Sequence, residues 1–199
     1  NSGAVQETLR LLAGPTSALE WRGNTHLPPE EAGSAAEETL RLLAESGLVP
    51  LAPSAALEPD NGGYVPVYTE PRLVMSMDES NLSAVVWTCC VASMPHNWIF
   101  IDDETGKMVQ TWLFAADAGQ TLSKAVIGWT QDPEQTFKTA EQWRVFLSEY
   151  YGMEMLLGES VREEWEDWED WYSSLFTLSF DAGTARLTLL GNGDVYFNS

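Results

Sequence analysis

The densest group of chemically reactive side chains in this sequence lies near its C-terminal end. Residues 159–172 hold seven carboxylates and three tryptophans in fourteen positions. A run of acids gathered on one surface suits the binding of a basic protein partner, which is the function that we expect of it. The residues of this candidate ligand-binding face are Glu163, Glu164, Glu166, Asp167, Glu169 and Asp170.

The same acids also have a plainer interpretation, as the solvated face of a helix that is anchored by its tryptophans. Residues 160–163 read Ser-Val-Arg-Glu, which has the form of a capping box and predicts a helix beginning at Val161. Val161, Trp165 and Trp168 would then share one face and leave the acids on the other. Because acids on a helix diverge from one another, we expect no metal ion and no other cofactor at this run.

A second group of carboxylates, Asp102-Asp103-Glu104, stands in the middle of the chain. Calcium loops alternate their ligands around a glycine bend, as in D-x-[DN]-x-[DN]-G, and neither acidic segment has that form. We therefore interpret both segments as solvated acidic surface with respect to metals.

Common catalytic motifs are missing from the sequence, which has no G-x-S-x-G, H-E-x-x-H or G-x-x-x-x-G-K-[ST]. We therefore expect a non-catalytic binding or regulatory module without catalytic residues. The alternative is a carbohydrate-active hydrolase or a glycan-binding protein. Glycoside hydrolysis needs only two suitably spaced carboxylates, and exposed tryptophans could line such a site. The tryptophans considered for that role are Trp21, Trp98, Trp112, Trp129 and Trp165.

The balance of charge excludes nucleic acid as an expected partner. The chain has Asp+Glu 30 against Lys+Arg 10, a formal net charge of -20 at pH 7. Nucleic acids and anionic membrane surfaces both bind through Lys and Arg, so this charge repels them. No apolar stretch is long enough to predict a membrane span. A cytoplasmic protein of a salt-adapted organism would show the same acidity, and that interpretation stays open.

The two cysteines, Cys89 and Cys90, are adjacent in an apolar segment, where alternation along a strand points them to opposite faces. We expect both to be small buried hydrophobic side chains. They cannot build a disulfide framework, and the two isolated histidines, His26 and His96, complete no zinc-ligand spacing.

Composition divides the chain into an N-terminal arm, residues 1–63, and an α+β domain, residues 64–199. The arm is rich in Ala, Pro, Gly and Glu, and it repeats the heptapeptide ETLRLLA at residues 7–13 and 38–44. The leucine spacing in each copy predicts a short amphipathic helix. We expect these helices to cover the core of the domain, while a repeated docking helix is the alternative.

One long helix is predicted inside the domain, over residues 133–151. Asp132 is a helix N-cap, Pro133 suits the first helical position, and Gly152 can close the C-terminal end. One face of this helix is apolar and is expected to lie in the core. Its residues are Phe137, Ala140, Trp143, Leu147, Tyr150 and Tyr151.

Strands account for most of the remaining domain. Segments 98–102 and 107–114 predict a hairpin closed by Gly106, and segment 83–92, apolar on both faces, predicts a central strand. The fold class is therefore α+β, with a mainly antiparallel sheet of seven or eight strands packed with two amphipathic helices and preceded by a short helical arm. The other predicted strands are residues 64–68, 73–77, 174–180, 185–190 and 195–198.

The first hairpin resembles the strand-turn-strand of PepSY-type domains. In residues 98–107, WIFIDDETGK, a D-x-x-T-G-K turn joins two strands, as it does in these extracytoplasmic bacterial domains. The resemblance implies a secreted or membrane-tethered module that inhibits, senses or scaffolds, without catalytic residues. We therefore expect an extracytoplasmic location, with the chain secreted or tethered through a removed N-terminal segment.

Overall fold

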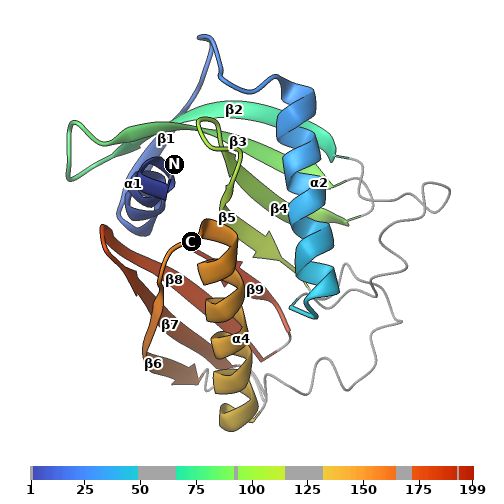
Figure 1. Ribbon diagram of the computed structural model, residues 1–199, viewed down its shortest axis with the longest axis vertical. Coiled ribbons are helices and arrows are strands. Elements are labelled where there is room, and N and C mark those ends of the chain that lie inside the picture. Colours follow the sequence, from blue (N-terminus) through green and yellow to red (C-terminus); the bar gives the residue numbers. More distant parts are fainter. Residues whose placement is uncertain (1, 49–65, 92–93, 115–131, 165–171, 192) are drawn as a thin grey trace, which may run out of the picture.

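An antiparallel sheet of nine strands organises the described part of the chain (Figure 1). The computed structural model describes residues 2–48, 66–91, 94–114, 132–164, 172–191 and 193–199. The strands lie in the order β1-β2-β3-β4-β5-β9-β8-β7-β6, and neighbouring strands are antiparallel throughout. Their bounds are β1 (Thr16–Glu20), β2 (Pro66–Ser76), β3 (Ser83–Val91), β4 (Met94–Asp102), β5 (Met108–Leu113), β6 (Leu156–Glu164), β7 (Tyr172–Phe180), β8 (Gly183–Leu190) and β9 (Val195–Phe197).

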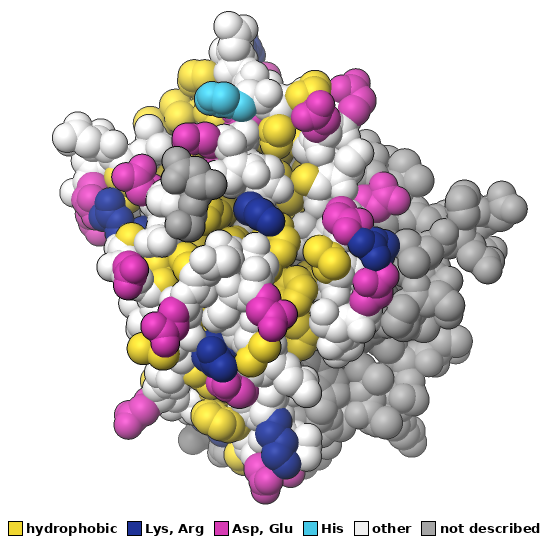
Figure 2. Space-filling model, in the orientation of Figure 1, with side chains coloured by type: hydrophobic (Ala, Val, Ile, Leu, Met, Phe, Trp, Pro, Cys, Tyr) yellow, Lys and Arg dark blue, Asp and Glu magenta, His cyan; other side chains and the backbone are white. Residues whose placement is uncertain are grey.

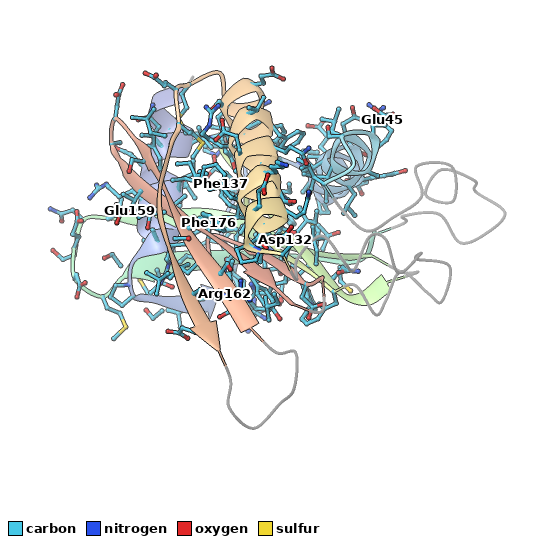
Figure 3. All side chains as sticks on the ribbon, turned by 90° about the horizontal axis from the view of Figure 1, so that it is seen from below. Glu45, Asp132, Phe137, Glu159, Arg162 and Phe176 are labelled. Atoms are coloured by element: carbon cyan, nitrogen blue, oxygen red, sulfur yellow. The ribbon has the colours of Figure 1, made fainter. Side chains whose placement is uncertain are left out.

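Three helices pack against this sheet in the described residues: α1 (Ser2–Ala13), α2 (Pro29–Glu45) and α4 (Pro133–Tyr151). α2 contacts strands β2 to β5, and α4 contacts β6 to β8. Both helices lie on the same side of the sheet in Figures 1 and 3. α1 lies between β1 and β8, where it contacts strands from both halves of the sheet (Figure 1). Among the described helices, none is long and apolar enough to cross a membrane.

The order of elements occurs twice along the chain. α2 is followed by the meander β2-β3-β4-β5, and α4 is followed by the meander β6-β7-β8-β9. The two meanders join through their last strands, where Thr111 of β5 lies opposite Phe197 of β9 and Leu113 lies opposite Val195. All four of these residues are buried, so the hydrophobic core continues across the junction.

The predicted helix over residues 133–151 is confirmed by α4. Asp132 accepts a hydrogen bond from the backbone N–H of Glu134 at 3.0 Å, and Gly152 takes the left-handed conformation, with φ 63°, that ends the helix. The predicted core face is confirmed for Ala140, Trp143, Leu147 and Tyr151, which are buried, and Tyr150 is half-buried. Phe137 is an exception, because its side chain is 54 % exposed near the start of the helix.

The predicted hairpin and the central strand are also confirmed. β4 and β5 are joined by a turn in which Gly106, with φ 69°, donates from its backbone N–H to the carbonyl oxygen of Asp102 at 2.8 Å. β7 and β8 form the second hairpin, and β3 lies between β2 and β4. Cys89 and Cys90 of β3 are both buried, as expected.

The repeated heptapeptide forms part of α1 and of α2. Leu9 and Leu40, which occupy the same position in the two copies, are both 0 % exposed. The copies differ further along, since Leu11 of α1 is buried whereas the equivalent Leu42 of α2 is only half-buried. Both helices thus contribute to the same hydrophobic core as the sheet. The division of the chain at residue 63 stays a prediction, because residues 49–65 lie outside the described part.

The helix predicted from Val161 is wrong for the described residues of that run. Residues 161–164 belong to β6, which pairs with β7 from Leu156 opposite Ser179 to Glu164 opposite Tyr172. A capping box reflects local hydrogen bonds only, whereas β7 supplies partners from a distant segment. The remainder of the predicted helix lies outside the described residues.

The predicted fold class, α+β with an antiparallel sheet, is confirmed. The details differ, since the described residues form nine strands instead of seven or eight, and three helices instead of two preceded by an arm. The N-terminal segment supplies one of the additional strands, because β1 pairs with β2 at the edge of the sheet.

Candidate functional site

A pocket of about 320 Å³ opens beside α1, where the β4–β5 turn meets the loop that follows β1. Its apolar wall comes from Leu73 of β2 and from Ala84 and Val85 of β3. No described Lys or Arg side chain lines it, so its charge is negative. We name it the acidic pocket, and its principal residues are Glu7, Trp21, His26, Asp102, Asp103 and Glu104.

The buried carboxylate of Asp103 is held by donors from two segments. Oδ1 accepts hydrogen bonds from the Trp87 indole Nε1 at 2.7 Å and from the Leu27 backbone N–H at 3.1 Å. Oδ2 accepts one from the His26 backbone N–H at 2.8 Å and lies 3.2 Å from the ring Nδ1 of His26. Burial by itself raises the pKa of Asp103, but these hydrogen bonds together outweigh it and lower the pKa below its ordinary value. Asp103 thus fixes the loop after β1 as a structural anion.

Asp102 joins the turn to α1. Its Oδ1 accepts a hydrogen bond from the Thr8 hydroxyl at 2.8 Å, and its Oδ2 accepts from the backbone N–H of Thr105 at 3.0 Å and from the Thr105 hydroxyl at 2.6 Å. Burial raises the pKa of Asp102, because these hydrogen bonds only partly offset the loss of water around a side chain that is 2 % exposed. Both oxygens are therefore already used within the fold.

Glu7 and Glu104 differ from the two aspartates. Both residues are exposed at the rim of the acidic pocket, Glu7 on α1 and Glu104 in the β4–β5 turn. Neither carboxylate makes a hydrogen bond or an ion pair with another described residue. We therefore regard these two carboxylates as the ones that a ligand could contact. The oxygens of Asp102 and Asp103 already accept hydrogen bonds that hold the turn in place.

Trp21 forms an aromatic wall of the pocket. Its indole Nε1 donates to the carbonyl oxygen of Asn24 at 3.1 Å, and its backbone N–H donates to the carbonyl oxygen of Pro71 at 3.2 Å. The ring packs directly on Gly23, where a Cβ atom would lie only 2.4 Å from Cζ2 of the indole. The position of the ring therefore depends on the absence of a side chain at Gly23.

This arrangement suits the binding of a cation. The indole face of Trp21 attracts positive charge, the carboxylates of Glu7 and Glu104 pair with it, and the apolar wall can contact an aliphatic stem. Within the described residues, no group of three or more His, Cys, Asp and Glu side chains is placed to hold a metal ion. An organic cation therefore fits the site better than a metal ion does.

The residues predicted from the sequence lie elsewhere. Glu163 is exposed on β6 and is not among the residues that line the acidic pocket, and the backbone of Glu164 belongs to the same strand. The predicted residues Glu166, Asp167, Glu169 and Asp170 lie outside the described part of the chain. Residues 166–170 therefore stay a prediction.

Sequence reasoning missed most of the acidic pocket. The sequence places Asp102, Asp103 and Glu104 at a hairpin turn and predicts a solvated acidic surface for them, whereas Asp102 and Asp103 are buried. Glu7 and Trp21 belong to the segment interpreted as an arm, and Trp21 is predicted only as a possible part of a glycan site. One feature of the sequence could have indicated the pocket, namely the two consecutive aspartates just before a Thr-Gly turn. Two neighbouring carboxylates need separate sets of hydrogen-bond donors, which other segments must bring to the turn. No known protein family model, curated protein or solved structure matches this chain.

Proposed function

We propose that this protein is a non-catalytic binding module that recognises a cationic side chain of a basic protein partner in the acidic pocket. The single observation that carries the proposal is the composition of the pocket. Two carboxylates, Glu7 and Glu104, line the pocket together with Trp21, and neither makes an ion pair or hydrogen bond with another described residue. The volume of about 320 Å³ accepts one side chain instead of an extended ligand.

The charge of the whole molecule supports the same class of partner. Figure 2 shows Asp and Glu side chains spread over the visible face, with few Lys and Arg among them. With a formal net charge of -20, the protein steers basic molecules towards its surface and raises their rate of association. The acids of residues 163–170 belong to this proposal as a second contact with the partner.

A binding role, as opposed to catalysis, is supported by what the buried groups do. The carboxylate oxygens of Asp102 and Asp103 accept hydrogen bonds from the fold itself. Burial raises the pKa of the Cys89 thiol to about 12, which keeps it protonated and unreactive. Neither aspartate nor this cysteine is therefore free to act as a base or a nucleophile.

We further propose that the module works outside the cytoplasm, as a secreted or membrane-tethered protein. This part of the proposal rests on the resemblance of residues 98–107 to PepSY-type domains, and on the β4–β5 hairpin that those residues begin. In this proposal the turn of that hairpin carries Asp103 and Glu104 and thus forms the recognition element.

A glycan-binding or hydrolytic function is the second candidate, and one observation favours it. Trp21 stands beside several carboxylates, one of which, Asp102, has a raised pKa that suits a general acid. A hydrolase requires that Asp102 reach the substrate. Cleavage of chitin or cellulose oligosaccharides that is lost on Asp102→Asn would favour this candidate over ours.

The proposal is tested with a capped peptide that carries one arginine between glycines and with its citrulline counterpart, which keeps the shape without the charge. Binding is followed by NMR through the indole signal of Trp21. We expect the arginine peptide to bind at least about tenfold more tightly, because charge-assisted contacts are lost with citrulline. The double variant Glu7→Gln/Glu104→Gln should bind the arginine peptide only as weakly as the wild type binds the citrulline peptide.

The matched control is Glu37→Gln/Glu149→Gln, which changes the net charge equally at exposed positions on α2 and α4. It should leave the affinity of the arginine peptide nearly unchanged. Equal binding of the arginine and citrulline peptides, or an equal loss in the control, would show that the acidic pocket does not select a cation.

A further inference from the structure

We propose that strand β6 is a docking edge to which an extended segment of a basic protein adds as a further strand of the sheet. β6 ends the order of strands and pairs only with β7 among the described strands. It is nine residues long and contains no proline. A strand of this kind presents backbone N–H and C=O groups on its free side, where another chain can pair.

Apolar side chains are exposed along the same strand. Leu156 and Val161 are 59 % and 58 % exposed, although both are large and apolar. They lie opposite Ser179 and Leu175 of β7, which places them on one face of the sheet, because residues directly opposite each other share a face. That face is opposite to the one that carries the buried Phe176, which lies between the sheet and α4 in Figure 3. An added strand could thus cover apolar surface that β7 and α4 leave open.

The other edge of the sheet offers much less. β1 is a strand of five residues, against nine in β6. Its exposed acid, Glu20, already pairs with Arg22 at 3.0 Å. β6 is therefore the edge with the length that strand addition requires.

The charge of β6 indicates which kind of segment would pair with it. Glu159 and Glu163 are exposed on the strand, whose one basic residue is Arg162. Figure 3 shows β6 at the free side of the sheet, with Glu159 labelled on it. A second copy of the chain, paired through β6, would bring acids against acids, which is destabilising when like charges lie opposite each other. An extended segment rich in Lys or Arg would instead be attracted.

A bulge limits where another strand can pair with β6. The register with β7 shifts between Leu157 and Ser160, around Gly158. Bulges and charges protect sheet edges against pairing with copies of themselves. The charges do not exclude a strand of opposite charge, whereas the bulge restricts pairing to the regular segments on either side of it.

The inference rests on the proposed function only for the sign of the partner's charge, since β6 shares no residue with the acidic pocket. The probe is a soluble peptide that alternates lysine with valine. Its control has the same sequence but carries N-methyl groups on alternate residues along the pairing edge, which removes backbone donors and keeps the charge. Amide hydrogen exchange of the protein locates the bound peptide.

We expect the unmethylated peptide to slow exchange of amides in β6 and to bind at least about tenfold more tightly than its methylated control, because main-chain hydrogen bonds supply the affinity of an added strand. Glu159→Lys/Glu163→Lys should abolish this protection. The charge-matched variant Glu37→Lys/Glu149→Lys and the pocket variant Glu7→Gln/Glu104→Gln should both retain it.

Equal binding of the methylated peptide would overturn the inference, and so would protection that appears elsewhere while β6 exchanges as before. Dimerisation of the protein through β6, seen as a concentration-dependent mass, would also overturn it in favour of a second copy. Loss of arginine recognition in the acidic pocket with intact protection of β6 would contradict the proposed function alone.

Discussion

The indole Nε1 of Trp87 lies 2.7 Å from Oδ1 of Asp103, and both side chains are buried. This hydrogen bond connects the centre of the sheet to the acidic pocket, because Trp87 belongs to β3 and Asp103 to the β4–β5 turn. A carboxylate at this position is held on both oxygens by N–H groups. The β4–β5 turn is therefore anchored in the core.

The adjacent aspartates should lose different amounts of stability on the same substitution. In Asp103→Asn, an amide NH₂ must face N–H donors on one side, so we expect a loss of about 2 kcal/mol or more in the free energy of unfolding. In Asp102→Asn, the new amide can donate to the Thr8 hydroxyl, while Thr105 still finds an acceptor. That variant should lose less than about 1 kcal/mol. Urea denaturation of both variants measures the difference, and equal losses would contradict this account.

The two aspartates also predict opposite dependences on pH. The lowered pKa of Asp103 contributes stability that is present above the unfolded-state pKa, about 3.9, and is lost as pH falls through the folded-state pKa. The advantage of the wild type over Asp103→Asn should therefore shrink in strong acid.

Asp102, whose pKa burial raises, has the reverse sign. Its folded form binds the proton more tightly than the unfolded chain does, so its contribution to stability falls as pH rises from about 3.9 through the folded-state pKa. Relative to Asp102→Asn, the wild type should therefore lose stability over that range. Denaturation curves of both proteins at several pH values measure the effect, and a constant difference between them would contradict it.

Gly23→Ala should disturb the acidic pocket without unfolding the protein. A Cβ atom at this position would meet the Trp21 ring at 2.4 Å, so the ring must move. Because Trp21 is only half-buried, we expect a stability change below about 1 kcal/mol. The arginine peptide should bind several-fold more weakly, since the ring would leave its place beside the carboxylates. Gly14→Ala, which meets nothing closer than 3.7 Å, is the matched control.

The repeated heptapeptide allows a comparison of identical residues in two environments. Leu11→Ala in α1 should cost about 2–5 kcal/mol in the free energy of unfolding, because the side chain is 1 % exposed. The equivalent Leu42→Ala in α2 should cost less, because Leu42 is half-buried. Thermal or urea denaturation measures both. A negligible effect of Leu11→Ala would show that α1 folds apart from the sheet.

Elements with complete local signals could be predicted from the sequence. α4 has its N-cap Asp132, its Pro133 and its terminal Gly152 within the segment itself, and the β4–β5 turn has Gly106 at the position that requires positive φ. Such signals depend on neighbours along the chain, so the sequence contains all the information that they need.

Elements that depend on distant partners could not be predicted in the same way. β1 has the exposure of a surface segment, and only its pairing with β2 makes it a strand. Residues 161–164 carry a helical capping signal, but pairing with β7 makes them part of β6. In both cases backbone hydrogen bonds to another segment decide the conformation, and local preferences are too weak to oppose them.

The acidity of the protein, its lack of common catalytic motifs and its division into strands and amphipathic helices were determined by the sequence alone. Only the tertiary structure brought Glu7 and Trp21 beside the β4–β5 turn, because the donors that hold Asp102 and Asp103 come from α1, β3 and the loop after β1. Buried carboxylates take their partners from wherever the chain supplies N–H and O–H groups in space. The distance between two residues along the sequence therefore does not indicate which donors hold these carboxylates.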